Sequence, residues 1–351
     1  MNNMKIYIRE VRVELSTRHL LRTIGIVANP VSGSDIRRIV SMATAFDNNE
    51  KLNIVKRIIL GADAIGVDKI YIMPDTFRIG SKVMEWVKRL SPIKAECEVL
   101  DMEVTGTILD TIRFSKKMEE IPADCLIVLG GDGTSRAAAK SIKNTPLLPI
   151  STGTNNVYPY FIEGTVGGMA ASVICNLANH DDICVQDKII EIRVNNKISD
   201  IALVDAVITS DKHTGSKAIW DIEKIKKIVV TRAHPEWIGF SSIVGSWEII
   251  RPDDDFGAEI DLGGSENGVI ASIAAGIIKG ISIRKFRRLL LGEICEYSAS
   301  ERCMIALDGE REIMLNSGDH VSFIVKRSGP VRVEISKTLE KAQRLGLFMR
   351  K

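Results

Sequence analysis

The sequence predicts an α/β domain with a doubly wound, mostly parallel sheet, followed by a sandwich-like all-β domain. Three observations lead to this prediction. Up to residue 150, short apolar runs typical of buried strands alternate with helical patterns. After residue 188, apolar and polar residues alternate with a period of two, and helical patterns are sparse. A length of 351 residues also favours two domains over a single core.

The first α/β unit begins with the apolar run 23–28, which ends in the turn-rich loop NPVSG at 29–33. Helical patterns follow at 35–46 and 50–66, the first of them after a polar cap. A strand, a glycine-containing loop and a capped helix are the repeating unit of a doubly wound fold. The residues before this unit alternate apolar and charged, which fits either a hairpin or an edge strand.

The same alternation continues to residue 150, with strands expected at 69–73, 96–100, 126–129 and 147–150, and helices at 81–90 and 106–119. In such sheets the ligand lies beyond the carboxyl ends of the strands. That rule places Asn29, Asp75, Asp132 and the loop after Ile150 in one crevice.

The segment DCLIVLGGDGTSR, at 124–136, is the strongest functional signal in the chain. A buried strand runs through a glycine pair into a helix start, which is how backbone N–H groups come to face an anion. Gly130, Gly131 and Gly133 let the main chain approach a phosphate, and Asp132 adds a carboxylate for a metal or a proton. A plain turn between strand and helix is the alternative.

The loop STGTNN, at 151–156, is dense in small donors and acceptors that do not suit a core. It predicts hydrogen bonds to a nucleotide or substrate, although a solvated turn that caps the next helix has the same composition.

In the β-rich part, a hairpin is expected around Asn195-Asn196. Asp308-Gly309 is a second hairpin-turn signal, and with Glu310 and Arg311 it places three charged residues at one turn. This turn is either structural or presents a base and a phosphate clamp. We place the domains at 1–160 and 161–330, and expect the segment 331–351 to pack back on the first domain.

Composition excludes several classes of protein. A net charge of +2 and 5% aromatic residues argue against nucleic-acid binding. The charged amino-terminal segment predicts neither a signal peptide nor stable membrane insertion. The six cysteines lack a C-x-x-C pair and the five histidines lack metal-ligand spacing, so we expect free thiols, no structural zinc and a cytoplasmic protein. Neither a P-loop nor a G-x-G-x-x-G fingerprint occurs.

With these motifs assembled, the chain resembles the superfamily of NAD kinases, diacylglycerol kinases and sphingosine kinases. The shared marks are NPVSG, GGDGT, GTNN at 153–156 and DGE at 308–310. On IGIVANPVSGSDIRR, VLGGDGTSR, PISTGTNN, IALVDAV and IALDGERE it is identified as a member of the AcoX family, which is named for acetoin catabolism and described as ATP-NAD kinase-like. These stretches are spread over nearly the whole chain.

The resemblance implies a nucleotide in the cleft between the domains. In NAD kinases the aspartate of GGDGT, here Asp132, is the proposed base, and in the lipid kinases the glutamate of DGE, here Glu310, has a similar role. The chain has Asn156 where NAD kinases usually have a glutamate, and its NPVSG and GTNN loops lean toward the lipid kinases.

We therefore expect an ATP- and Mg²⁺-dependent kinase acting on a hydroxyl group, with NAD the leading acceptor and a homo-oligomer as the assembly. The alternatives are a kinase for another small hydroxylated metabolite or lipid, and a non-catalytic nucleotide-binding regulator. The donor, ATP or polyphosphate, stays open. The candidate site comprises catalytic Asp132 and Glu310; nucleotide or phosphate contacts Asn29, Pro30, Ser32, Gly33, Gly130, Gly131, Gly133, Thr134, Thr152, Gly153, Thr154, Asn155 and Asn156; and second-domain contacts Asp308, Gly309 and Arg311.

Overall fold

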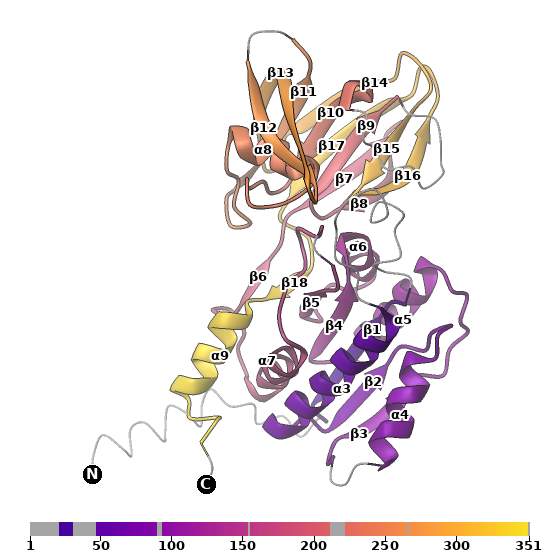
Figure 1. The fold of residues 1–351 in the computed structure, drawn as a ribbon, viewed down its shortest axis with the longest axis vertical. Coiled ribbons are helices and arrows are strands. Elements are labelled where there is room, and N and C mark those ends of the chain that lie inside the picture. The colour runs from indigo at the N-terminus through magenta and orange to yellow at the C-terminus, as the bar shows by residue number, and fades with distance from the viewer. Residues whose placement is uncertain are drawn as a thin grey trace.

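The computed structural model describes residues 21–30, 47–89, 93–153, 155–210, 222–264 and 267–349. The expected amino-terminal hairpin or edge strand and the helix expected at 35–46 lie outside the described residues. Figure 1 shows an α/β domain and a β domain stacked along the long axis, with α6 at the end of the first that faces the second.

Within the described residues, the first sheet has the strand order β3-β2-β1-β4-β5-β18-β6. Neighbours from β3 to β18 pair in parallel, and only β6 pairs antiparallel, at the edge. The strands are β1 Thr23–Ala28, β2 Lys69–Ile72, β3 Glu96–Val99, β4 Cys125–Gly130, β5 Leu147–Ser151, β6 Cys184–Gln186 and β18 Val331–Val333.

Helices cover both faces of this sheet. Residues of α3, α4, α7 and α9 share one buried cluster with one face of β1 and β4, while α5 and α6 pack on the opposite face. The helices are α3 Asn48–Ile65, α4 Ile79–Arg89, α5 Ile108–Glu120, α6 Asp132–Ala139, α7 Gly164–Asn176 and α9 Ile335–Arg344.

Helix α7 had no predicted bounds, because glycines at 164, 167 and 168 disfavour an isolated helix. In the structure two glycines allow α7 and α3 to cross closely. A Cβ on Gly168 would lie 2.0 Å from the Ile58 carbonyl oxygen, and one on Gly61 would lie 2.1 Å from that of Thr165. Packing between the helices therefore overrides the low helix propensity of glycine.

The second domain contains two antiparallel sheets within the described residues, with strand orders β12-β13-β11-β10-β9-β15-β16 and β14-β17-β7-β8. A buried apolar cluster from both sheets lies between them. Its elements are β7 Ile189–Val194, β8 Lys197–Ala202, β9 Asp205–Thr209, a 3-10 helix at Ile222–Lys224, β10 Ile225–Val230, α8 Phe240–Trp247, β11 Phe256–Leu262, β12 Gly268–Ala274, β13 Ile277–Leu290, β14 Ile294–Ser298, β15 Cys303–Leu307, β16 Glu310–Leu315 and β17 His320–Lys326.

The predicted fold class is confirmed: a mostly parallel α/β domain is followed by antiparallel β-sheets. Both hairpins predicted from turn residues form. Asn195 and Asn196 have φ of 49° and 66° between β7 and β8, and Asp308 and Gly309 have φ of 50° and 79° between β15 and β16. Two consecutive residues with positive φ match the twist of a two-residue hairpin.

The chain passes from the first sheet to the second between β6 and β7, and returns between β17 and β18. Helix α7 and strand β6 thus belong to the first sheet's layers although they lie beyond residue 160, where we drew the boundary. Helix α9 buries Ile335 and Ala342 in the core of the α/β domain.

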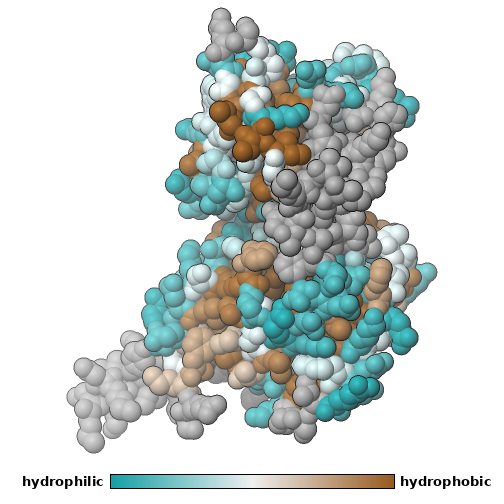
Figure 2. Space-filling model, in the orientation of Figure 1, coloured by the Kyte–Doolittle hydropathy of each residue, from teal (hydrophilic) through white to brown (hydrophobic). Residues whose placement is uncertain are grey.

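No helix in the described part of the chain is long and apolar enough to cross a membrane. Figure 2 shows apolar surface over the end of the β domain where β12 and β13 lie. Ile270 and Ile278 on these strands are 75% and 68% exposed.

Candidate functional site

Three loops meet at the carboxyl ends of neighbouring strands in the α/β domain. Because β4 lies between β1 and β5, the loops that follow Ala28, Gly130 and Ser151 are adjacent. The Asn29 side-chain amide donates to Thr134 Oγ1 at 3.2 Å, which joins the first loop to the GGDGT segment. Asn156 Nδ2 donates to Ser151 Oγ at 2.8 Å and closes the third loop on itself.

The glycines of the GGDGT loop stand where side chains would collide. A Cβ on Gly130 would lie 2.6 Å from Thr134 Cβ, and one on Gly131 would lie 2.7 Å from Asn156 Oδ1. A Cβ on Gly133 would lie 2.3 Å from Glu310 Oε1, an atom of the second domain. The absence of side chains thus lets helix α6 begin directly beneath both the third loop and the second domain.

These glycines should differ in their cost of substitution. Gly130→Ala meets the Cβ of Thr134, which is fixed on the first turn of α6, so we expect a loss of about 1–3 kcal/mol in unfolding free energy. Gly133→Ala meets the flexible end of Glu310, which moves aside, so we expect a loss below about 1 kcal/mol. Urea unfolding of both variants measures this difference, and equal losses would contradict it.

Asp132 is the first residue of α6, and its half-buried carboxylate faces the third loop. Its Oδ1 accepts the N–H of Tyr158 at 2.8 Å and that of Val157 at 3.1 Å. Burial, and then repulsion from Asp308, raises the pKa of Asp132 to about 7, against the opposing effect of the two N–H groups. A carboxyl with a pKa close to neutral is suited to accept a proton in a reaction.

The turn at the start of β16 brings the second domain to this loop. The Asp308 carboxylate is buried and accepts the N–H groups of Leu203, Val204 and Asp205, at 2.9, 2.7 and 3.2 Å. It therefore fixes the corner between β8 and β9. Glu310, two residues on, has a side chain 45% exposed that lies against Gly133.

Arg136 joins the two domains at this point. Its fully buried guanidinium lies 3.2 Å from Asp200, 3.6 Å from Asp308 and 3.5 Å from Glu310, all carboxylate oxygens of the second domain. Sequence analysis missed this residue. The available signal is an arginine two residues after GGDGT, followed by a run of alanines whose face has to be buried.

Lys51 is a second missed residue. Its side chain on α3 is 1% exposed, and Nζ donates to the carbonyl oxygens of Asn29 and Pro30 at 2.9 and 3.1 Å. The bonds hold the start of the NPVSG loop. Its signal is a lysine on the apolar face of α3, three residues before Ile54.

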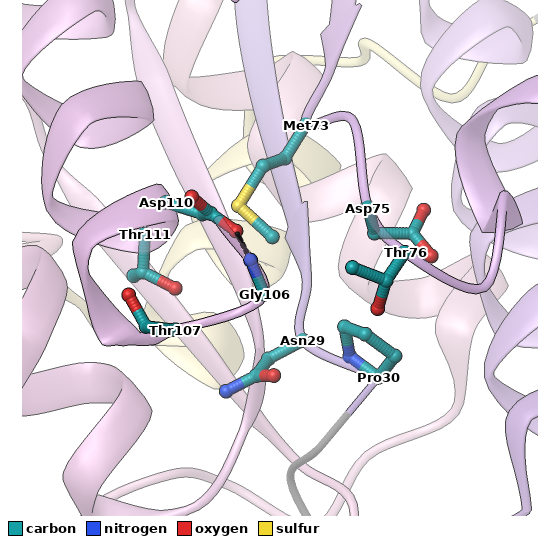
Figure 3. Close-up of a pocket in the computed structure, with 9 residues that line it drawn as sticks. All are labelled: Asn29, Pro30, Met73, Asp75, Thr76, Gly106, Thr107, Asp110 and Thr111. Atoms are coloured by element: carbon teal, nitrogen blue, oxygen red, sulfur yellow. Dashed lines mark hydrogen bonds between the residues drawn. The ribbon is translucent and has the colours of Figure 1, made fainter. Parts of the chain in front are cut away.

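A pocket opens beside these loops (Figure 3). The Asp75 carboxylate, after β2, accepts the N–H groups of Phe77 and Gly80 at 2.9 and 3.2 Å, and Asp110 accepts that of Gly106 at 2.7 Å. The predicted neighbours Asn29 and Asp75 do line one pocket. Its walls are Asn29, Pro30, Met73, Asp75, Thr76, Gly106, Thr107, Asp110 and Thr111.

The structure describes only some of the other predicted site residues. Thr152 donates its N–H to the Gly130 carbonyl oxygen at 3.2 Å, so it lies beside the GGDGT loop. Ser32, Gly33 and Thr154 lie outside the described residues. The backbone of Arg311 pairs with Ala306 in the β15–β16 hairpin.

The loop fits a polyphosphate, since Gly131 gives the start of α6 no side-chain cap and the first N–H groups of the helix can face an anion. Mg²⁺ binds to proteins through one or two carboxylates and completes its shell with phosphates and water. Glu310 is exposed and lies against Gly133 at the start of α6, so it suits that requirement. The described residues contain no group of three or more metal-ligating side chains.

Two family models match the chain: the ATP-NAD kinase N-terminal domain over residues 24–176, and the acetoin catabolism protein X C-terminal domain over residues 188–328. Acetoin catabolism protein X of Cupriavidus necator is 33% identical over 340 residues, covering 92% of each chain. An uncharacterized protein of Archaeoglobus fulgidus is 42% identical over 64 residues, 18% of this chain and 21% of that one.

Among solved structures, yeast NADH kinase complexed with NADH superposes with a TM-score of 0.52. It covers 95% of this chain and 90% of its own length at 14% identity, which is a likeness of fold alone. The extent and identity of the Cupriavidus match settle the family: the chain belongs to the family of acetoin catabolism protein X, with an NAD kinase-like first domain.

Proposed function

We propose that this protein is an ATP- and Mg²⁺-dependent kinase that phosphorylates a hydroxyl group, with NAD the leading acceptor. One observation carries the proposal. The Asp132 carboxylate, with its pKa near 7, lies on a glycine loop at a helix start, where Glu310 and Arg136 join the second domain to the first. Phosphoryl transfer requires N–H groups that hold an anion and a base beside them, and the start of α6 offers both.

In the proposed reaction, Asp132 accepts the proton of the acceptor hydroxyl. The hydroxyl oxygen forms a bond to the γ-phosphorus of ATP as the bond from that phosphorus to the bridging oxygen breaks, and ADP leaves with the electron pair. When bound, Mg²⁺ neutralises the charge of the phosphates, and Glu310 would hold it. Main-chain N–H groups of Gly131 and Gly133 orient the phosphates.

The remaining predicted residues have supporting roles in this proposal. Thr134, Asn155 and Asn156 position the nucleotide or the acceptor, and Arg311 steadies negative charge. Glu310 is the second candidate for the base, since it lies against Gly133 from the other domain.

The rate of transfer should depend on the ionisation of Asp132. A general base acts only when deprotonated, so kcat/KM should fall about tenfold per pH unit below pH 7 and level off above it. Because Asp308 interacts with Asp132, the midpoint belongs to the coupled groups. A pH–rate profile from pH 5 to 9 tests this, and a flat profile across pH 7 would contradict a role for Asp132 as the base.

The acceptor is tested by incubating the protein with Mg²⁺, γ-labelled ATP and a panel of NAD, diacylglycerols and polyols. We expect label on NAD. Label only on a lipid or polyol would replace NAD as the acceptor and leave the kinase proposal in place. Stabilisation by ATP without label on any acceptor would favour a nucleotide-binding regulator.

A further inference from the structure

Tyr158 connects Asp132 to a buried polar cluster at the junction of the domains. Its backbone N–H donates to Asp132 Oδ1 at 2.8 Å, and its side-chain hydroxyl donates to Asp187 Oδ2 at 2.7 Å. The residue is 2% exposed. The two ends of one buried residue therefore hold the candidate base and a second carboxylate.

Asp187 is the centre of that cluster. It is fully buried, and besides Tyr158 it accepts Arg232 at 2.9 Å and Arg332 at 2.8 Å. Its own N–H donates to the Pro330 carbonyl oxygen at 3.0 Å, so it lies where both chain crossings between the domains run side by side. A carboxylate held by two guanidinium groups is a rigid anchor.

The cluster fixes the ring of Tyr158 as well as its hydroxyl. The Arg232 guanidinium carbon lies 5.0 Å from the Tyr158 ring centroid, within cation–π range. Burial raises the pKa of the Tyr158 hydroxyl well above its usual value, so the hydroxyl stays protonated and donates to Asp187. The side chain is thus held at its ring and at its tip.

We propose that Tyr158 is a positioning residue for Asp132, which it orients by anchoring the Val157–Tyr158 peptide to the Asp187 cluster at the domain junction. The inference rests on the proposed function in taking Asp132 as the proton acceptor. Two N–H groups aimed at the carboxylate fix its rotamer. Among the described residues, Oδ2 receives a single, longer bond, from Val157 at 3.2 Å. A fixed carboxylate with an available oxygen is the arrangement that proton transfer requires.

The N–H bonds from Val157 and Tyr158 lower the pKa of Asp132. Removing the Tyr158 hydroxyl should loosen this peptide and weaken both bonds. The groups that face Asp132 from other elements are Asp308 and Arg232 of the second domain, with Glu310 against the neighbouring Gly133. None of them is altered by Tyr158→Phe. The variant should therefore raise the pKa of Asp132.

Selective labelling gives a readout that does not depend on turnover. The chain has five tyrosines, so ¹⁵N-tyrosine labelling gives few amide signals, and that of Tyr158 should titrate with Asp132 around pH 7. In the Tyr158→Phe variant, ¹⁵N-phenylalanine labelling adds one amide signal, at position 158. We expect its midpoint to move up by about half a pH unit or more.

Tyr160→Phe is the matched control. The Tyr160 hydroxyl donates to Glu334 at 2.9 Å and its ring lies 5.2 Å from Arg332, but its backbone N–H donates to Pro149. Tyr160 thus contacts Arg332 of the Asp187 cluster, but its N–H does not bind Asp132. The Tyr158 amide in this variant should titrate as in the wild type.

Kinetics give the second readout. Tyr158→Phe should lower kcat about tenfold and leave KM for ATP within about twofold, since the phosphate loop is untouched. An unmoved midpoint at position 158, or equal shifts in both variants, overturns the positioning role. A shifted midpoint without phosphoryl transfer by the wild type supports the positioning role and rejects the kinase.

Discussion

Asp132→Asn should lower kcat by about 10²–10⁴-fold while the fold stays intact. The amide lacks the basic lone pair that accepts the acceptor's proton. Its oxygen can keep the bonds that Oδ1 receives from Tyr158 and Val157, so the third loop should stay in place. Rates of ADP and phosphorylated product formation measure the effect.

The same substitution should stabilise the protein at alkaline pH. The pKa of Asp132 is about 7 in the fold and about 3.9 in an unfolded chain, so the folded state binds the proton more tightly. Stability therefore falls as pH rises from about 4 to about 7. Asparagine does not ionise, and we expect a gain of up to about 4 kcal/mol at pH 8 that is much smaller at pH 5.

Asp63→Asn is the matched control for the loss of activity. Asp63 Oδ1 accepts the N–H groups of Lys94 and Ala95 at 2.7 and 2.8 Å, much as Asp132 accepts two. It lies by the amino end of β3, at the opposite edge of the sheet from the candidate site. The control should keep full activity. Equal loss of activity in both variants would contradict the assignment of Asp132.

Arg136→Met should cost about 3–5 kcal/mol of unfolding free energy. The fully buried guanidinium balances Asp200, Asp308 and Glu310, and methionine leaves these carboxylates without that charge. Breaking a buried ion pair from one side leaves an uncompensated charge, which is why the cost is large. Urea unfolding at pH 7 measures it.

Lys140→Met is the control for this substitution. Lys140, on the exposed side of the same region, contacts Asp200 at 2.7 Å with a side chain 26% exposed. Exposed ion pairs contribute about 0–1 kcal/mol to stability. Lys140→Met should therefore lose several-fold less unfolding free energy than Arg136→Met. Similar losses would show that Arg136 is not the charged link between the domains.

Much of the fold could be predicted from the sequence, because the apolar patterns of most strands and helices match the faces that they bury. The strand of β4 is a continuous apolar run that is buried on both faces, and α3 carries its apolar residues at helical spacing. Helix α7 could not be bounded, since its glycines oppose helix formation and only the packing on α3 explains them. The local sequence of α7 does not indicate its contact with α3.

The candidate site could be predicted where loops carry glycines and polar residues in unusual density, as at 130–134 and 151–156. Arg136, Lys51 and Tyr158 could not be predicted, because each acts through a partner distant in sequence. Arg136 meets Asp308 only where the second domain lies against the first, and Tyr158 meets Asp187 at the junction of the domains. In the sequence, Arg136 and Lys51 can be noticed only as charged residues among the apolar residues of a helix.

A crystal structure of the protein with Mg²⁺ and a non-hydrolysable ATP analogue tests the central claim most directly. The account predicts the phosphates against Gly130, Gly131 and Gly133, with the Asp132 carboxylate facing the terminal phosphate across the crevice. Phosphates bound away from this loop, or an Asp132 carboxylate turned from them, would contradict it.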